Sequence, residues 1–329
     1  MDSIYSEHSL SGGVMWMTHD ESRLRISLKN SDQFLALFHP PLLDRHKVAP
    51  KVDLSLFVLK IDGGEFDYDN LYKQLGNASY AYVLSRVKFA GLEQGNVHEL
   101  TKAVQGSFRA VRINDGEGGE LLLYCFLESH LGAPKLLSKM ELKTDNNDYV
   151  KGADGLHLLQ VQPGEFHLIY GESKMIADST ERGSSFRKAI ADAISSVKKL
   201  RTTGLSNEVN LVDSNLMKEA FSGAELAFLK SVLVPTRNGP AKESAFGLLL
   251  GFEIDTGDWP LIEMTAGQFS ERVHTEVQAM VEARFEYIKD QLVNAGLEGF
   301  HFYIWAIPFI KNGATNIDSV RKSIVGYIA

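Results

Sequence analysis

The sequence predicts an α/β fold, and two groups of apolar runs support this prediction. Residues 155–161 and 165–174 are rich in β-forming residues and are joined by a short Gln-Pro-Gly segment, which predicts an antiparallel hairpin. Residues 245–255 and 300–310 have the uninterrupted apolar character of buried strands and flank a long helical segment. Because strand, helix and strand in that order form a parallel crossover unit, we expect one mixed sheet flanked by helices.

Residues 1–105 are expected to form an N-terminal α/β region, ahead of a larger domain at 106–329. Four elements are expected in this region: strands at 22–30 and 52–61, and helices at 67–89 and 96–111. These segments contain no motif that carries chemistry. We therefore interpret the region as an extension that binds a partner.

The composition is that of an ordinary globular protein, with 329 residues of which 44% are hydrophobic. The formal net charge is -8, so binding to nucleic acid would require a local basic patch rather than an overall positive field. The first residues lack the basic and apolar segments of a signal peptide. The most apolar runs have about ten residues, half of what a membrane-spanning helix needs. We expect a cytoplasmic protein without a membrane segment.

The element before the hairpin is predicted to be a short apolar helix at residues 120–132. Glu120 lies in its first turn, and Gly132 provides a C-terminal stop. The single cysteine, Cys125, lies among apolar residues of this helix, so we expect a buried thiol rather than a nucleophile. A strand at 135–143 and a polar turn follow the helix.

Two helices are predicted after the hairpin. The first covers residues 184–201, with Ser184 or Ser185 as its N-cap. Its basic residues are Arg187, Lys188, Lys198, Lys199 and Arg201. The second covers residues 270–296 and has one apolar face. That face consists of Val273, Val277, Met280, Val281, Phe285, Ile288 and Leu292.

Three charged residues are predicted to meet at one end of the hairpin. Glu172 and Lys174 are two residues apart near the end of the second strand, so both project from one face. Asp154 precedes the first strand and would lie opposite them if the strands pair about the turn. Two converging carboxylates repel one another unless a cation lies between them, and Mg²⁺ prefers such oxygen ligands. The lysine could hold a water or stabilise charge on a phosphate, which suits metal-assisted phosphodiester hydrolysis.

The same pattern has a second interpretation, which is a solvated ion pair at a sheet edge. A Glu-x-Lys triplet arises readily by composition, and another one is present at Glu141-Leu142-Lys143. On this interpretation the chain would be a non-catalytic regulatory or scaffolding subunit whose acidic hairpin end contacts a partner. Loss of activity on changing Lys174 to Met, with folding intact, would distinguish the two interpretations.

Other catalytic motifs are absent from the sequence. It contains no Gly-x-Gly-x-x-Gly or Walker A loop, so no nucleotide cofactor is expected on this chain. The histidines lack the paired spacing of a zinc protease, and no Gly-x-Ser-x-Gly segment is present. His157 and His167 alternate with apolar residues in the hairpin, so structural roles are favoured for both.

Three segments carry a resemblance to a known family, namely residues 119–136 (GELLLYCFLESHLGAPKL), 151–159 (KGADGLHLL) and 168–175 (LIYGESKM). Their order is a helix with an acidic residue, a strand, a strand that follows an aspartate, and a strand that ends in Glu-x-Lys. This order resembles the restriction-endonuclease-like fold with its PD-(D/E)xK signature. More narrowly, the segments resemble the HamA-like nuclease subunit of Hachiman anti-phage defence systems. The resemblance is good over residues 105–205 and loose elsewhere.

The resemblance implies a DNA nuclease that needs Mg²⁺ or Mn²⁺ and works beside a superfamily-2 helicase subunit. It also implies a restriction-endonuclease-like core that follows the N-terminal extension. Position by position, Asp154 and Glu172 match the metal-binding carboxylates, and Lys174 matches the catalytic lysine. Glu120 matches an additional acidic residue of the first helix, with Glu117 and Glu128 as close competitors in the sequence.

Overall fold

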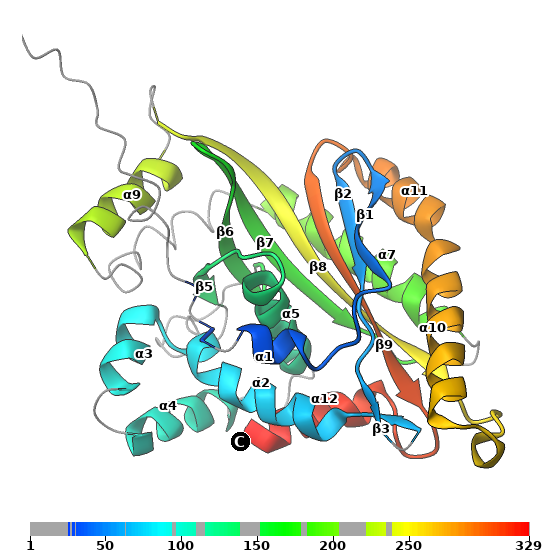
Figure 1. Ribbon diagram of the computed structural model, residues 1–329. Coiled ribbons are helices and arrows are strands. Elements are labelled where there is room, and N and C mark those ends of the chain that lie inside the picture. The colour runs from blue at the N-terminus through cyan, green and yellow to red at the C-terminus, as the bar shows by residue number, and fades with distance from the viewer. Residues whose placement is uncertain are drawn as a thin grey trace, which may run out of the picture.

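The computed structural model describes residues 26, 28–29, 31–62, 64–93, 97–109, 116–138, 152–178, 183–203, 222–234 and 239–328. Its centre is a seven-stranded sheet with the order β1-β2-β9-β8-β7-β6-β5, and β3 and β4 form a separate pair (Figure 1). The strands are β1 Leu43–Ala49, β2 Val52–Leu56, β3 Ile61–Asp62, β4 Glu65–Phe66, β5 Lys135–Ser138, β6 Gly155–Gln162, β7 Glu165–Met175, β8 Ala241–Asp255 and β9 His301–Lys311. The predicted α/β class is confirmed.

Helices cover both faces of this sheet (Figure 1). They are α1 Ser31–Leu35, α2 Tyr68–Val83, α3 Arg86–Glu93, α4 Val97–Arg109, α5 Glu117–Ser129, α7 Ser184–Thr203, α9 Gly223–Leu233, α10 Ala266–Glu282, α11 Phe285–Ala295 and α12 Ile317–Ile328, with a 3₁₀ turn at Leu261–Glu263. Helix α5 lies against one face, with α2 and α12 beside it, and α7 lies against the other face.

The hairpin of β6 and β7 forms as the sequence predicts. The strands pair antiparallel, and Gly164 occupies the turn with φ at +80°, a conformation that glycine adopts without strain. The last pair at the open end is Gly155 with Gly171. Strand β7 therefore continues for four residues beyond β6, and these residues include the predicted Glu-x-Lys triplet.

The remaining central strands are parallel. Strand β8 pairs with β7 on one side and with β9 on the other, and β9 pairs with β2. The predicted crossover unit is thus confirmed, and it extends the sheet that the hairpin begins. Because β1 and β2 belong to the same sheet, strands from both sides of the proposed boundary at residue 105 share one layer.

Small residues bring α5 close to the sheet. A Cβ atom added to Gly171 of β7 would lie 3.1 Å from Leu123 of α5, and one added to Gly247 of β8 would lie 3.0 Å from Leu127. A larger residue at either position would require the facing leucine side chain of α5 to shift. This close packing fixes the helix that carries Glu120 against the strand that carries Glu172.

The predicted helix at 67–89 is divided in two, which corrects that expectation. Helix α2 ends at Val83, and Leu84 has extended dihedral angles before α3 begins. The fully buried ammonium of Lys135 lies at the break and donates to the carbonyls of Ala81, Tyr82 and Leu84. These carbonyls are ones that a helix end leaves without intrahelical partners.

The predicted helix at 270–296 is also divided. Helix α10 begins with a capping box formed by Thr265 and Gln268 and ends at Glu282. Helix α11 then begins at Phe285 and ends with Gly296 in the left-handed conformation. After the break, α11 packs against both α7 and β1.

The expected N-cap of α7 is wrong. Ser184 and Ser185 both lie inside the helix, whose first amides are instead capped by Asp178. That carboxylate accepts hydrogen bonds from the backbone N–H groups of Gly183, at 2.9 Å, and Ser185, at 2.7 Å. The Ser185 hydroxyl accepts a hydrogen bond from the backbone N–H of Glu253 in β8, so it ties the helix to the sheet.

Several expectations concern residues outside the described ranges. They are most of the strand at 22–30, the end of the helix at 96–111, the end of the strand at 135–143, and the second triplet at Glu141-Leu142-Lys143. Ile26, Leu28 and Lys29, which are described, belong to no strand. Among the described helices, none is long and apolar enough to cross a lipid bilayer.

Candidate functional site

Asp154 lies immediately before β6, at the edge where β7 loses its antiparallel partner. Its backbone N–H donates to the carbonyl of Gly171 at 2.8 Å. Its Oδ2 accepts hydrogen bonds from Ser173, at 2.9 Å from the backbone N–H and at 3.2 Å from the hydroxyl. The residue is 7% exposed. The hairpin therefore holds this carboxylate opposite the triplet, as the sequence predicts.

Glu172 and Lys174 project from the same face of β7 and contact each other. The Lys174 ammonium lies 2.5 Å from Glu172 Oε1, and the two side chains are 28% and 14% exposed. The pKa of the Glu172 carboxyl is raised to about 7, first by burial and then by the charge of Asp154. Lys174 and a hydrogen bond with Ser196 of α7 act in the opposite direction. Burial and the Asp154 charge together thus outweigh the stabilisation of the ionised form by the lysine.

Glu120 lies in the first turn of α5 and is 6% exposed. Its Oε2 accepts a hydrogen bond of 3.1 Å from the hydroxyl of Tyr82, which α2 supplies. Burial raises the pKa of Tyr82 well above its usual value, and the charges of Glu120, Asp154 and Glu117 raise it further. The Tyr82 hydroxyl therefore lies in the negative field of carboxylates from both α5 and the start of β6.

The described residues do not bring all four predicted site residues equally close. Asp154, Glu172 and Lys174 form one group at the hairpin edge. Glu120 adjoins this group through Tyr82, but it does not join the two other carboxylates in a cluster whose ligating atoms all lie within 4.8 Å of one another. Among the described residues, Glu120, Asp154 and Glu172 thus do not form a compact cluster of three carboxylates.

Of the two competitors for Glu120, Glu128 has a structural position. It is fully buried, and its carboxylate accepts hydrogen bonds from the backbone N–H groups of Leu28, at 2.6 Å, and Lys135, at 2.9 Å, and from the hydroxyl of Tyr124, at 3.2 Å. Glu117 is 1% exposed and contributes less than Glu120 to the field at Tyr82. Glu120 thus remains the predicted site acid of this helix, whereas the carboxylate of Glu128 is engaged by three hydrogen bonds in the interior.

Two glycines at the start of α5 allow close packing, Gly119 against the end of β7 and Gly118 against α12. A Cβ atom on Gly119 would lie 3.1 Å from the Ser173 hydroxyl and 3.2 Å from the Met175 sulfur. A Cβ atom on Gly118 would lie 3.3 Å from Ile324 of α12. Gly119 allows the first turn of the helix to approach Ser173, the residue that orients Asp154.

The other residues that the sequence analysis considered lie away from this edge or are inert. His157 is buried and its Nδ1 contacts the carbonyl of Ala133 at 2.8 Å, and burial lowers its pKa to about 3. Its predicted structural role is confirmed. Cys125 is fully buried, and burial raises its pKa well above the usual value, so no reactive thiolate forms there. His167 lies near the opposite end of β7.

The basic residues of α7 have different positions. Arg187 stacks over the ring of Tyr287 at 4.1 Å, and the guanidinium of Arg201 donates to the carbonyl of Gly296 at 2.5 Å. Lys188 forms an ion pair with Asp192 within the helix. The side chains of Lys198 and Lys199 are exposed. These two exposed lysines follow Ser196, the residue that contacts Glu172, along the same helix.

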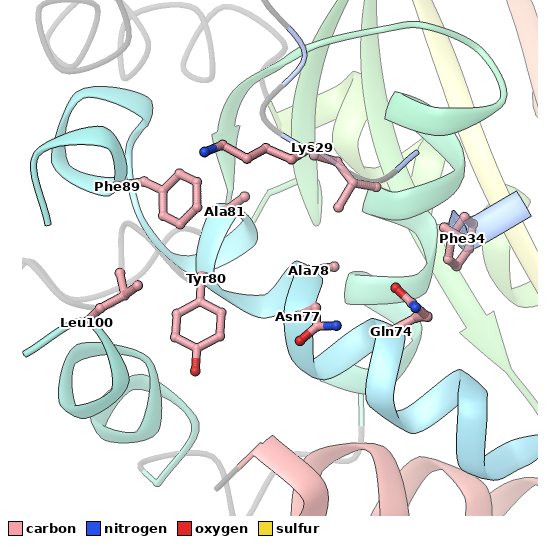
Figure 2. Close-up of a pocket in the computed structure, with 10 residues that line it drawn as sticks. Lys29, Phe34, Gln74, Asn77, Ala78, Tyr80, Ala81, Phe89 and Leu100 are labelled. Atoms are coloured by element: carbon pink, nitrogen blue, oxygen red, sulfur yellow. The ribbon is translucent and has the colours of Figure 1, made fainter. Parts of the chain in front are cut away.

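A pocket of about 320 Å³ lies on the other side of α2. Figure 2 shows that Tyr80 and Ala81 of α2 line it together with Phe89 of α3 and Leu100 of α4. Its described lining includes Lys29 but no carboxylate, so it lacks the ligands that a divalent metal needs. Ala81 precedes Tyr82, and α2 therefore separates this pocket from the carboxylates.

The groups at the hairpin edge fit a hard divalent cation. Asp154 and Glu172 offer carboxylate oxygens, which Mg²⁺ and Mn²⁺ prefer. The raised pKa of Glu172 shows that its negative charge is poorly compensated beside Asp154. A cation between the two acids would relieve this repulsion. Lys174 supplies a positive charge that is partly exposed and can act on a bound substrate.

A second group of potential ligands was not predicted from the sequence. His167, Glu243 and His301 bring one ligating atom each within 4.8 Å of one another. From the sequence, His157 and His167 could be structural or lie near the site, and a structural role is favoured for both. Glu243 follows His167 by 76 residues and His301 follows it by 134, so the group becomes visible only in the register of β7, β8 and β9.

A family model described as HamA matches residues 36–323. The match covers most of the chain and includes every candidate residue at the hairpin edge, together with the strands β1 and β2. No curated protein and no solved structure matches the chain.

Proposed function

The chain belongs to the HamA family, a subunit family of Hachiman anti-phage defence, and from this premise we propose that it is the divalent-metal-dependent DNA nuclease of such a system. The observation that carries the proposal is the convergence of Asp154, Glu172 and Lys174 at the end of β7. Two acids whose charges repel and a nearby lysine are the groups that metal-assisted phosphodiester hydrolysis requires.

In this proposal Asp154 and Glu172 hold Mg²⁺ or Mn²⁺. Glu120 lies beside them and supports the site through its contact with Tyr82. The metal, when bound, supplies Lewis-acid stabilisation of the phosphate and lowers the pKa of a water. Ser173 keeps Asp154 in place with two hydrogen bonds, so the carboxylate does not need to reorganise when the substrate arrives.

In this proposal Lys174 contacts the substrate. In the protein alone its ammonium is held by Glu172 Oε1. The same ammonium could donate a hydrogen bond to an attacking water or to a phosphate oxygen, with Glu172 engaged as a metal ligand. Because the side chain is 28% exposed, substrate can reach it from solvent.

Partner binding completes the proposal. The net charge of -8 gives weak attraction to a polyanion, and the exposed lysines that follow Ser196 supply only two positive charges. We therefore propose that a superfamily-2 helicase subunit engages DNA with ATP and restrains the nuclease until aberrant DNA is met. The N-terminal region, residues 1–105, is proposed as a partner-binding surface.

The test of the active site uses Lys174→Met and Glu172→Gln in the full chain, with its helicase co-expressed. DNA cleavage is measured in Mg²⁺, in Mn²⁺ and in EDTA. We expect each variant to lose at least about 10²-fold in rate, because each removes a group that acts on the transition state. EDTA should abolish cleavage by the wild type. Circular dichroism and melting curves establish whether each variant remains folded.

The matched control is the pair Lys289 and Glu286, an exposed ion pair of 2.6 Å on α11. Lys289→Met and Glu286→Gln remove the same charges far from the hairpin edge, and cleavage should be unchanged. Undiminished cleavage in folded Lys174→Met would refute the catalytic proposal. Absence of cleavage by the wild type with its partner, under every metal condition, would favour a regulatory subunit.

Metal binding is tested separately from activity. Mg²⁺ should raise the melting temperature of the wild type more than that of Asp154→Asn, because a ligand stabilises only the state that binds it. Equal increases in the two proteins would show that Asp154 is not a ligand.

A further inference from the structure

A cluster of potential metal ligands lies at the end of the sheet opposite the candidate active site. It consists of His167 in β7, Glu243 in β8 and His301 in β9, whose ligating atoms all lie within 4.8 Å of one another. Along β7, His167 is five residues from Glu172, which is about 16 Å at the rise of a strand. Because five is odd, the two side chains also project from opposite faces. The two groups are therefore separate.

The register of three parallel strands creates this cluster. His167 pairs with Glu243, and His301 pairs with Ala245, which lies two residues after Glu243 and thus on the same face. Neighbouring strands are about 4.8 Å apart, so side chains at these positions converge. All three residues lie near the beginning of their strands, where a metal can be reached from solvent. Their exposure rises from a buried His167 to an exposed Glu243.

The contacts around the cluster orient the two imidazoles. His167 Nδ1 lies 2.8 Å from the hydroxyl of Tyr303, which leaves Nε2 of His167 for a metal. His301 Nε2 lies 3.5 Å from Glu243 Oε2, and the two imidazole rings are 4.3 Å apart. A hydrogen bond to the second ring nitrogen is the usual way in which proteins fix a metal-binding histidine.

One cation already lies near the carboxylate. The Lys51 ammonium is 3.8 Å from Glu243 Oε2 and donates to the carbonyl of Gly299 at 3.0 Å. The lysine contact is long, and the Glu243 side chain is 61% exposed, so this ion pair holds the carboxylate weakly. Lys51 is expected to compete with a metal for Glu243 rather than to exclude it.

We propose that His167, Glu243 and His301 form a binding site for Zn²⁺ or a similar transition-metal ion. Two imidazoles and one carboxylate are ligands that Zn²⁺ prefers, whereas Mg²⁺ prefers oxygen ligands alone. The ion would join the beginnings of β7, β8 and β9 and would keep a position open to water. The site is independent of the proposed nuclease activity.

The experiment measures Zn²⁺ binding to the untagged full-length chain after treatment with a chelator. Isothermal titration with ZnCl₂ gives stoichiometry and affinity, and Co²⁺ in place of Zn²⁺ reports coordination through its visible absorption bands. We expect one high-affinity site per chain, no competition from Mg²⁺, and a melting temperature that rises with Zn²⁺.

Three variants test the assignment. His301→Gln and Glu243→Gln each remove a ligand and should weaken Zn²⁺ binding at least tenfold. Tyr303→Phe leaves the ligands but removes the contact to His167 Nδ1, and it should weaken binding by about 10-fold or more. Lys51→Met removes the competing cation, so it should strengthen binding or leave it unchanged.

The matched control is His274→Gln. His274 belongs to another pair of histidines, with its ring 4.7 Å from that of His39, and this pair does not belong to the described three-ligand cluster. Zn²⁺ affinity should be unchanged in this control. The proposal is refuted if the chelated chain binds no Zn²⁺, or if His301→Gln and Glu243→Gln bind as tightly as the wild type. It is also refuted if Asp154→Asn alone abolishes binding.

Discussion

The backbone N–H of Ser173 donates to Asp154 Oδ2 at 2.9 Å, so the middle residue of the Glu-x-Lys triplet holds the carboxylate that lies opposite the triplet. Glu172 and Lys174 project from one face of β7, and Ser173 projects from the other face toward α5. One strand end thus positions all three charged groups of the candidate site.

Ser173→Ala should weaken the site without dismantling it. The variant loses the hydroxyl contact of 3.2 Å to Asp154 but keeps the backbone contact. We expect a loss of about 1 kcal/mol in the free energy of unfolding, together with a severalfold loss of nuclease rate. Ser231→Ala is the control, because it removes a hydroxyl that bonds a helix carbonyl in α9. Equal nuclease rates in wild type and Ser173→Ala would show that the hydroxyl does not position Asp154.

Gly119→Ala should disturb the site by overpacking. The new Cβ would lie 3.1 Å from the Ser173 hydroxyl and 3.2 Å from the Met175 sulfur, so these side chains must shift, and we expect a cost of about 1 kcal/mol or more because the Ser173 hydroxyl also contacts Asp154. Gly106→Ala in α4 should instead increase the free energy of unfolding. No atom lies within 4 Å of a Cβ there, and alanine favours a helix by about 1 kcal/mol over glycine. Urea unfolding of the two variants checks the predicted difference in sign.

Glu120→Gln and Glu128→Gln should separate function from stability. Glu128 accepts three hydrogen bonds in the interior, and an amide nitrogen cannot accept them, so Glu128→Gln should lose about 2 kcal/mol or more. Glu120→Gln can keep its contact with Tyr82 and removes a charge beside Asp154, so its stability should be nearly unchanged. Its cleavage rate and its Mg²⁺-induced rise in melting temperature should both fall. A large stability loss in Glu120→Gln alone would reverse this assignment.

Glu172→Gln should stabilise the metal-free protein at high pH. The folded-state pKa of Glu172 is raised to about 7, from an ordinary 4.5, so its ionised form is disfavoured by folding. This penalty is absent below pH 4.5, grows between pH 4.5 and 7, and is complete above pH 7. The gain in melting temperature should therefore increase over that window in EDTA. Glu286→Gln serves as the control. A gain that is the same at pH 4 and pH 8 would contradict the prediction.

His157 should make the protein sensitive to acid. Burial lowers its folded-state pKa to about 3, from 6.5, so the unfolded chain binds a proton that the folded chain does not bind between these values. Its contribution to stability is complete above pH 6.5 and declines as the pH falls toward 3. His157→Gln should cost stability at pH 7, because the contact with Ala133 is altered, but its stability should fall less steeply with acid. Parallel curves for wild type and variant would contradict this assignment.

Local periodicity was enough to place the three central residues of the candidate site. A strand repeats every two residues, so Glu172 and Lys174 had to share a face, and a hairpin closed at Gly164 had to bring Asp154 opposite them. The buried Cys125 and the structural His157 also followed from their apolar neighbours. These inferences needed only backbone geometry and neighbouring residues.

Tertiary structure decided the features that depend on distant contacts. Periodicity could not show that the Lys135 ammonium binds the carbonyls at the end of α2. It also could not show that Glu128 accepts hydrogen bonds in the interior while Glu120 contacts Tyr82. The contact between His167 and His301 could not be predicted from periodicity either, because it depends on strand order and register. Hydrophobic patterns predict which face of an element is buried, but the element that covers this face is determined by packing across the whole sheet.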